Sequence, residues 1–167
     1  MELVTLEGVG LPGGVLTVPL GGRNKPYEVS TAVGVVATVE PGPDKRTQLI
    51  RMVGAVWLLQ REKNRALRIT DTESGGVVAQ TDKRRRDVTI GAWAVRMERG
   101  TLTGTPKRWV GADGAPVLET GVQGVFRRSV ELTVGPNGLA GWAVVALAVL
   151  TRHLFLDADE DAAGVVV

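Results

Sequence analysis

The chain has 167 residues, 44% of them hydrophobic and 23% charged, with a formal net charge of +2 at pH 7. This length and balance are typical of one globular domain with a sizeable core, and they exclude an intrinsically disordered chain. The chain contains no cysteine, which excludes disulfides, thiolate zinc sites, cysteine nucleophiles and palmitoyl anchors.

The amino terminus and the charge distribution set two further expectations. The first ten residues, "MELVTLEGVG", have no basic region before an apolar run, so they do not resemble a secretory signal and we expect a cytoplasmic protein. Residues 44–108 hold 15 Lys and Arg against 7 Asp and Glu, whereas the rest of the chain holds 5 against 11. A basic middle and an acidic tail indicate either an anionic partner or a solvated surface.

Short strands and glycine turns dominate the chain before residue 138. We expect a first pair of strands at 3–6 ("LVTL") and 14–20 ("GVLTVPL"). Valine and threonine then recur in short alternating runs between turns that contain glycine. That pattern predicts an all-β fold.

Three later segments share one plan, which indicates an internal repeat. Each is a strand, a turn and a glycine that leads directly into a second apolar strand, at 27–40, 67–82 and 108–121. After each hairpin a polar or basic piece leads into another apolar strand, at 55–62, 88–98 and 124–134. We therefore expect three approximate copies of a three-strand unit, although loosely spaced hairpins occur in any all-β protein.

The segment at about 138–154 is expected to be a helix. Asn137 suits the N-cap, and no polar side chain occurs from Leu139 to Leu150. Such a helix either spans a membrane or is enclosed by its own protein. A span needs about 20 apolar residues, so we predict a buried core helix and no transmembrane segment. Its expected core positions are Leu139, Trp142, Val145, Ala146, Val149 and Leu150.

The layout resembles the superfamily that contains the tubby carboxy-terminal domain, the phospholipid scramblases and the LURP-one-related proteins. The stretch "GVFRRSVELTVGPNGLAGWAVVALAVLTRHLF" (124–155) is similar to the last strand and enclosed helix of that group. The hairpins at 67–82 and 108–121 are similar to its "strand, D-x-x-G, strand" units. The resemblance covers residues 15 to 156. It implies a closed antiparallel β-barrel, built from repeated hairpins around a buried hydrophobic C-terminal helix.

This resemblance also sets the expected boundaries and limits the expected activities. Residues 1–156 are expected to form a single barrel domain, and residues 157–167 an acidic, flexible tail. Calcium-dependent scramblase activity is not implied, because "VGPNG" (134–138) before the helix holds no carboxylate and the chain holds no cysteine. Tubby domains would imply phosphoinositide binding through basic side chains on the barrel exterior, but no individual residue can be aligned with theirs.

The strongest charge cluster is "DKRRRD" at 82–87. Successive cations can bind lipid headgroups or nucleic-acid phosphates, but they are also typical of an exposed loop between strands. The candidate anion-binding residues are Lys83, Arg84, Arg85, Arg86, Lys107 and Arg108.

Other patterns do not indicate catalysis or metal binding. His153 is the single histidine, and at the expected helix end it would interact with the helix dipole. The acidic run at 157–162 lacks the glycine and the final glutamate of a calcium loop. We therefore predict no metal site, no cofactor and no enzyme.

The sequence thus predicts a non-enzymatic binding or scaffold domain. Its basic loops would contact anionic lipid headgroups or a membrane surface. The alternatives are a nucleic-acid-associated protein that uses the same cations and a protein–protein interaction module. Nucleic acid is the weaker of these, because the chain holds two Phe and one Tyr and so offers few aromatic side chains for base stacking.

Overall fold

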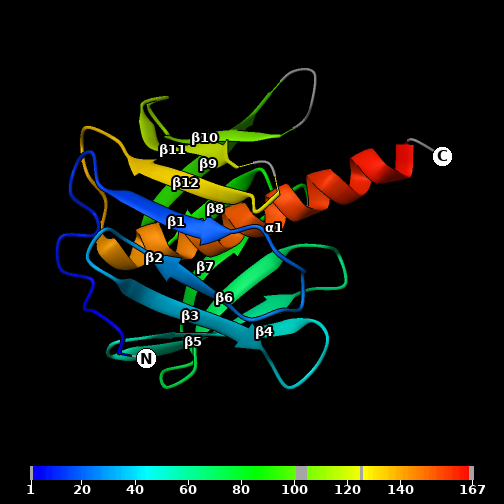
Figure 1. Cartoon of the computed structure of the whole chain (residues 1–167), viewed down its shortest axis with the longest axis horizontal. Coiled ribbons are helices and arrows are strands. Elements are labelled where there is room, and N and C mark those ends of the chain that lie inside the picture. The colour runs from blue at the N-terminus through cyan, green and yellow to red at the C-terminus, as the bar shows by residue number, and fades with distance from the viewer. Residues whose placement is uncertain (1, 101–104, 125, 166–167) are drawn as a thin grey trace.

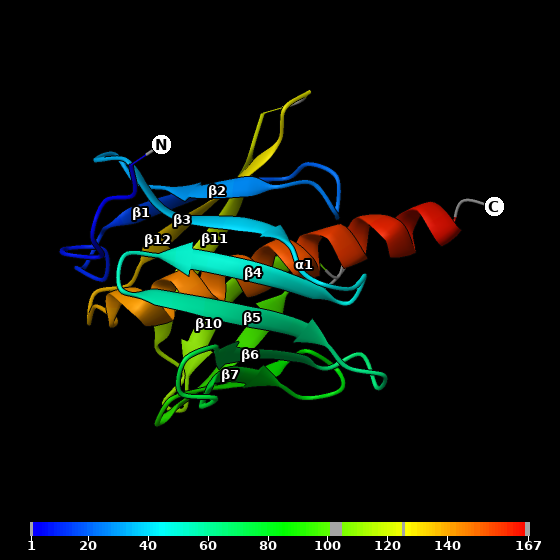
Figure 2. The same cartoon turned by 90° about the horizontal axis from the view of Figure 1, so that it is seen from below.

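The computed structural model describes residues 2–100, 105–124 and 126–165, with side chains up to residue 159. Twelve antiparallel strands form a closed barrel, and one helix, α1, runs through it and projects from one end (Figures 1 and 2). This architecture confirms the predicted fold class.

Each strand pairs with its neighbours in the chain, and the pairing of β1 with β12 closes the barrel from Val15↔Thr133 to Pro19↔Ser129. The elements are β1 (Val15–Pro19), β2 (Tyr27–Ser30), β3 (Val35–Pro41), β4 (Thr47–Met52), β5 (Ala55–Arg61), β6 (Leu67–Asp71), β7 (Val77–Thr81), β8 (Asp87–Ile90), β9 (Trp93–Arg99), β10 (Pro106–Gly111), β11 (Pro116–Gln123), β12 (Ser129–Val134) and α1 (Gly141–Val165).

Alternation along the strands determines which side chains face the helix. In β12, Val130, Leu132 and Val134 are buried, while Glu131 and Thr133 between them are partly exposed. Successive side chains of a strand point to opposite faces, so the apolar set fills the barrel and the polar set lies outside. The same period of two is what predicted strands from the sequence.

Two tight turns were not anticipated, and they change the strand count. The expected strand at 88–98 is two strands, β8 and β9, joined by Gly91 and Ala92. The polar or basic piece expected before the strand at 55–62 contains β4, which Val53 and Gly54 join to β5 by a similar turn. Gly54 and Gly91 have positive φ values of 83° and 55°, which glycine adopts readily. The repeat therefore has four strands, as β2–β5 and β6–β9, and β1 completes the third copy after β12.

The amino-terminal segment is not a strand, although one was expected at 3–6. Residues 2–14 instead pack over the start of the helix, where the Leu139 amide donates to the Gly10 carbonyl over 2.8 Å. A Cβ added at Gly10 would lie 1.5 Å from the Leu139 carbonyl oxygen. Only glycine allows this close approach of two backbone segments.

Helix α1 differs from the expected helix at both ends. It starts at Gly141, so Asn137 and Leu139 precede it, and it continues to Val165. The helix therefore continues past its expected end at about residue 154, and the backbone of residues 157–165 is helical. Three ion pairs hold the first turn of this extension against the barrel, because Asp157 pairs with Arg23 and Arg85, and Asp159 pairs with Arg128.

The apolar part of α1 is enclosed on all sides. Val145, Ala146, Val149 and Leu150 are buried, whereas Trp142 is half-buried and stacks on Trp93 with ring centroids 5.7 Å apart. Gly141–Asp159 is long and apolar enough for a membrane span, but 78% of its apolar window is buried inside the protein. The strands therefore provide the apolar surroundings that this helix requires.

Polar side chains of α1 fix its position in the barrel. The Trp109 indole N–H donates to the Thr151 hydroxyl over 2.9 Å. The Arg152 guanidinium donates to the carbonyls of Pro19 and Gly22 over 2.9 and 3.0 Å, and its Cζ lies 3.9 Å from the Tyr27 ring centroid. Beyond Thr17 the strands β1 and β2 are no longer paired, since their registered pair is Thr17↔Ser30. Arg152 thus donates hydrogen bonds to backbone carbonyls at the place where β1 and β2 are no longer paired with each other.

Replacing Val145 with Asp should unfold the barrel. Val145 is fully buried, and an unpaired buried charge costs several kcal/mol, comparable to the total stability of a domain. Val33→Asp is the matched control, because Val33 is 83% exposed. Thermal unfolding followed by circular dichroism should show loss of the transition in the first variant and little change in the second. A folded Val145→Asp protein would contradict the enclosed-helix architecture.

Candidate functional site

The two ends of the barrel differ in charge. Alternate connections of an antiparallel barrel lie at the same end, and Arg152 of α1 contacts Pro19 and Gly22 where the helix leaves. We call this end the basic end. It is formed by the connections 20–26, 42–46, 62–66, 82–86 and 124–128, apart from Val125, which lies outside the described residues, and by Gly100 and Thr105 between β9 and β10.

The five named connections hold 12 of the 20 Lys and Arg of the chain. They are Arg23, Lys25, Lys45, Arg46, Lys63, Arg65, Lys83, Arg84, Arg85, Arg86, Arg127 and Arg128. The described connections at the opposite end hold no Lys or Arg, and their charged residues are Glu2, Glu7, Glu73 and Asp113. The fold thus concentrates positive charge at one end of the barrel axis, which attracts anions toward that end.

The loop 82–86 exposes three of the predicted cations and buries the fourth. Lys83, Arg84 and Arg86 are exposed, whereas Arg85 is 5% exposed and has a φ of 56°. The Arg85 guanidinium turns toward α1, where it pairs with Asp157 and donates to the Arg65 carbonyl over 2.6 Å. Nε and Nη1 of Arg85 thus contact protein groups, so Arg85 is buried and does not share the exposed surface of Lys83, Arg84 and Arg86.

Lys107 and Arg108 lie in a strand, at the start of β10, and not in a loop. Lys107 is exposed. Arg108 is half-buried, and its Nε lies 3.6 Å from Glu98 Oε1 on β9. Since β10 starts at the basic end, Lys107 extends the positive surface there, whereas Glu98 partly neutralises Arg108.

Sequence reasoning missed the cations of the connections 20–26, 42–46 and 62–66. A signal for two of these loops was present, because "EKNR" and "DKRR" start 20 residues apart at Glu62 and Asp82. Arg65 and Arg85 take the same place in these loops, and both have positive φ values, 74° and 56°. Had the repeat been read as four strands, two strands would have been expected between the connections 62–66 and 82–86, which places both connections at the same end of the barrel.

Guanidinium groups surround the carboxylate of Asp157 inside the basic end. Asp157 is 9% exposed, and its Oδ1 lies 2.6 Å from Arg23 Nη2, while Oδ2 pairs with Arg85 Nη1. Burial, followed by the positive charges of Arg61 and its neighbouring arginines, lowers the pKa of Arg85 to about 10. Arg85 still carries its charge at neutral pH, so Asp157 joins the helix to two loops of the barrel.

His153 lies within the helix and not at its end, which corrects the expected interaction with a helix terminus. It is buried, and its Nε2 lies 3.1 Å from Gln48 Oε1. Because the Gln48 amide donates to the Arg23 carbonyl, Gln48 Oε1 accepts from an Nε2–H of His153. Burial, then the positive charges of Arg23, Arg152, Arg85 and Arg61, lower the pKa of His153 to about 3. The imidazole is therefore neutral.

The space beside His153 is too small for a lipid headgroup. Its volume is about 30 Å³, between side chains that include Arg23, Arg46 and Arg61. That volume holds about one water molecule. A larger anion would have to contact the outward-facing side chains of the basic end.

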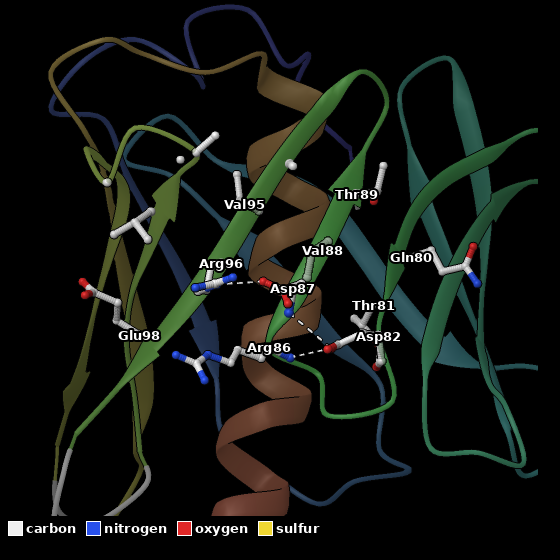
Figure 3. Close-up of a pocket in the computed structure, with 15 residues that line it drawn as sticks. Gln80, Thr81, Asp82, Arg86, Asp87, Val88, Thr89, Val95, Arg96 and Glu98 are labelled. Atoms are coloured by element: carbon white, nitrogen blue, oxygen red, sulfur yellow. Dashed lines mark hydrogen bonds and ion pairs between the residues drawn. The ribbon is translucent and has the colours of Figure 1, made fainter.

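A wide trough lies on the outer wall over β7 to β10, with a volume of about 780 Å³. Figure 3 shows Arg96 and Asp87 facing each other across β9 and β8, with an Nε–Oδ1 distance of 2.8 Å. Asp82 accepts from the amides of Arg86 and Asp87 in the same trough. The hydrogen bond to Asp87 raises the pKa of Arg96. This trough holds charges of both signs, so it does not provide a strong anion site.

Comparisons with known proteins identify the fold and no more. The sequence matches no protein-family model and no curated protein. Among solved structures, the X-ray structure of a protein from Arabidopsis thaliana is similar, with a TM-score of 0.58 and 14% sequence identity over 91% of this chain and 98% of that one. This similarity supports the closed barrel. Within the described residues, no group of three or more His, Cys, Asp or Glu could hold a metal ion.

The buried imidazole predicts an acid sensitivity. The pKa of His153 is about 3 in the folded protein, against an ordinary value of 6.5 in an unfolded chain. Below pH 6.5 the unfolded chain binds a proton that the folded protein does not, so stability is lost as the pH falls toward 3.

Urea denaturation of the wild type and of His153→Gln, at pH 7 and pH 4.5, tests this sensitivity. The wild type should lose about 2–3 kcal/mol more free energy of unfolding between the two values than the variant does. Equal losses in both proteins would contradict a neutral, buried His153.

Proposed function

We propose that the protein is a non-enzymatic binding domain that attaches to anionic membrane surfaces through the basic end of its barrel. The observation that carries the proposal is the separation of charge between the two ends of the barrel. One end holds 12 Lys and Arg in its connections, and the other holds none in its described connections. Near an anionic bilayer each such cation contributes about 1 kcal/mol of attraction.

An exposed aromatic side chain at the basic end favours lipid over nucleic acid. Phe126 is 100% exposed, and Arg127 and Arg128 follow it in the connection between β11 and β12. An apolar group next to cations suits the interfacial region of a bilayer, where aromatic side chains are enriched and two combined signals give stable attachment. Phosphate contacts with duplex DNA would make no use of Phe126.

We also propose membership of the tubby, scramblase and LURP-one-related superfamily, and a location in the cytoplasm. The first is supported by the barrel that encloses the C-terminal helix, which is the layout expected from the sequence resemblance. The proposed cytoplasmic location agrees with the proposed anionic lipid ligand, because the cytoplasmic leaflet carries the anionic lipids to which a basic surface binds.

Neutralising two exposed loop cations should weaken attachment. Lys83→Gln combined with Arg84→Gln should lower the affinity for vesicles of phosphatidylcholine with 30% phosphatidylserine by roughly 30-fold, equivalent to about 2 kcal/mol. Arg85 is left unchanged because removing one partner of its buried pair with Asp157 would leave an unpaired buried charge. Co-sedimentation at low and high salt measures the affinity, and vesicles of phosphatidylcholine alone should bind little protein.

The matched control removes the same charge from the barrel wall, by Arg51→Gln and Arg96→Gln. Both arginines are exposed and pair with surface carboxylates. Binding that falls equally in both double variants would show that net charge, not the basic end, determines attachment. Binding to duplex DNA but to no vesicle would favour the nucleic-acid alternative. Absence of both interactions would overturn the proposal and leave protein partners to be tested.

Replacing Phe126 with Ser should weaken the part of vesicle binding that resists salt. Salt screens the attraction between charges, but burial of a Phe side chain contributes about 1.5–3 kcal/mol through removal of apolar surface from water. The variant should therefore bind at least tenfold more weakly in 0.5 M salt. Val33→Ser, at the opposite end and 83% exposed, is the control. Unchanged binding of Phe126→Ser would place Phe126 outside the contact.

A further inference from the structure

The acidic end of α1 projects from the basic end of the barrel. Figures 1 and 2 show the helix extending past the connections at that end in both views. The first carboxylates of this part, Asp157 and Asp159, pair with arginines of three different connections. An anionic surface that approaches along the barrel axis therefore meets helical carboxylates together with the cations.

The two helical carboxylates differ in how readily an anion could replace them. The pairs of Asp157 with Arg23 and Arg85 are largely buried, with side chains between 7% and 20% exposed. Removing one partner from such pairs destabilises a protein. Asp159 pairs with Arg128 at the surface, where the two side chains are 44% and 40% exposed. Exposed pairs are weak in water, so an anionic surface can exchange with Asp159 but not with Asp157.

We infer that Asp159 is an internal competitor that occupies Arg128 and restrains membrane attachment. This inference rests on the proposed function and adds a mode of regulation to it. Arg128 lies in the same connection as Arg127 and Phe126, so the ion pair anchors to α1 the loop that carries the exposed aromatic side chain. A surface dense in anionic lipid displaces Asp159, whereas a sparsely charged one does not.

The adjacent arginine supplies an internal control. Arg127 is exposed, and Arg128 is paired with Asp159. If Asp159 occupies Arg128, then Arg128 contributes to vesicle binding only after Asp159 is removed. Arg127 contributes whether or not Asp159 is present. The coupling between positions 128 and 159 therefore separates competition from a general effect of charge.

Six proteins test the inference with vesicles of phosphatidylcholine and 30% phosphatidylserine: the wild type, Asp159→Asn, and Arg127→Gln and Arg128→Gln in each of these backgrounds. Asp159→Asn should bind about fivefold more tightly than the wild type, the effect of one charge near an anionic bilayer. Arg128→Gln should cost less than twofold when Asp159 is present and about fivefold in Asp159→Asn. Arg127→Gln should cost about fivefold in both.

The outcomes separate this inference from the function on which it rests. Equal losses from Arg128→Gln in the two backgrounds, or wild-type affinity in Asp159→Asn, would overturn the inference and leave the proposed attachment intact. No binding by any of the six proteins would overturn both. Binding by Asp159→Asn but not by the wild type would support strong restraint. Thermal unfolding of each variant verifies that the barrel is folded, which the surface location of these three side chains predicts.

Discussion

Helix α1 is apolar on every side for several turns, and such a helix is stable in water only when other elements enclose it. The twelve strands satisfy this requirement by closing into a ring around Ala143–Leu150, whose side chains are buried throughout. Small side chains such as Ala143, Ala146 and Ala148 let the strands approach the helix closely. The inward-facing positions of every strand are therefore constrained by the helix, while the outward positions and the connections are free to carry charge.

The enclosed helix also determines how the two ends of the barrel differ. At the end where α1 starts, the backbone of residues 2–14 covers the helix, and Gly10 allows direct contact with Leu139. At the other end the helix leaves the barrel and becomes polar, so Arg152, His153 and Asp157 meet the connecting loops. Alternate connections of an antiparallel barrel lie at one end. Because the connections that hold the Lys and Arg side chains alternate in this way, their positive charge is concentrated where the helix leaves the barrel. Eight of the 15 Lys and Arg in the basic middle of the sequence, residues 44–108, lie in connections at this end.

Periodicity in the sequence was enough to predict an all-β chain and an enclosed helix, and the family resemblance supplied the closed barrel. The strand count failed in two ways. The two-residue turn at Gly91 made β8 and β9 look like one strand, and β4 lies in the stretch that was expected to be a polar or basic piece before the strand at 55–62. The site was only partly predictable. Lys83 and Arg84 are exposed as expected, but Arg85 is buried in a pair with Asp157, more than 70 residues further along the chain. The residues close to Arg85 in the sequence give no indication of a contact with a residue so far along the chain.

The order of elements along the chain has a consequence for biosynthesis. During translation the twelve strands leave the ribosome before α1 does. The barrel can close only after β12 has been synthesised, because β12 pairs with β1. Until the helix is available, the inward faces of the strands have no partner and are exposed to water. Such long-range closure is slow and leaves apolar surface open to aggregation. The nascent chain is therefore the form of this protein that most needs chaperone protection.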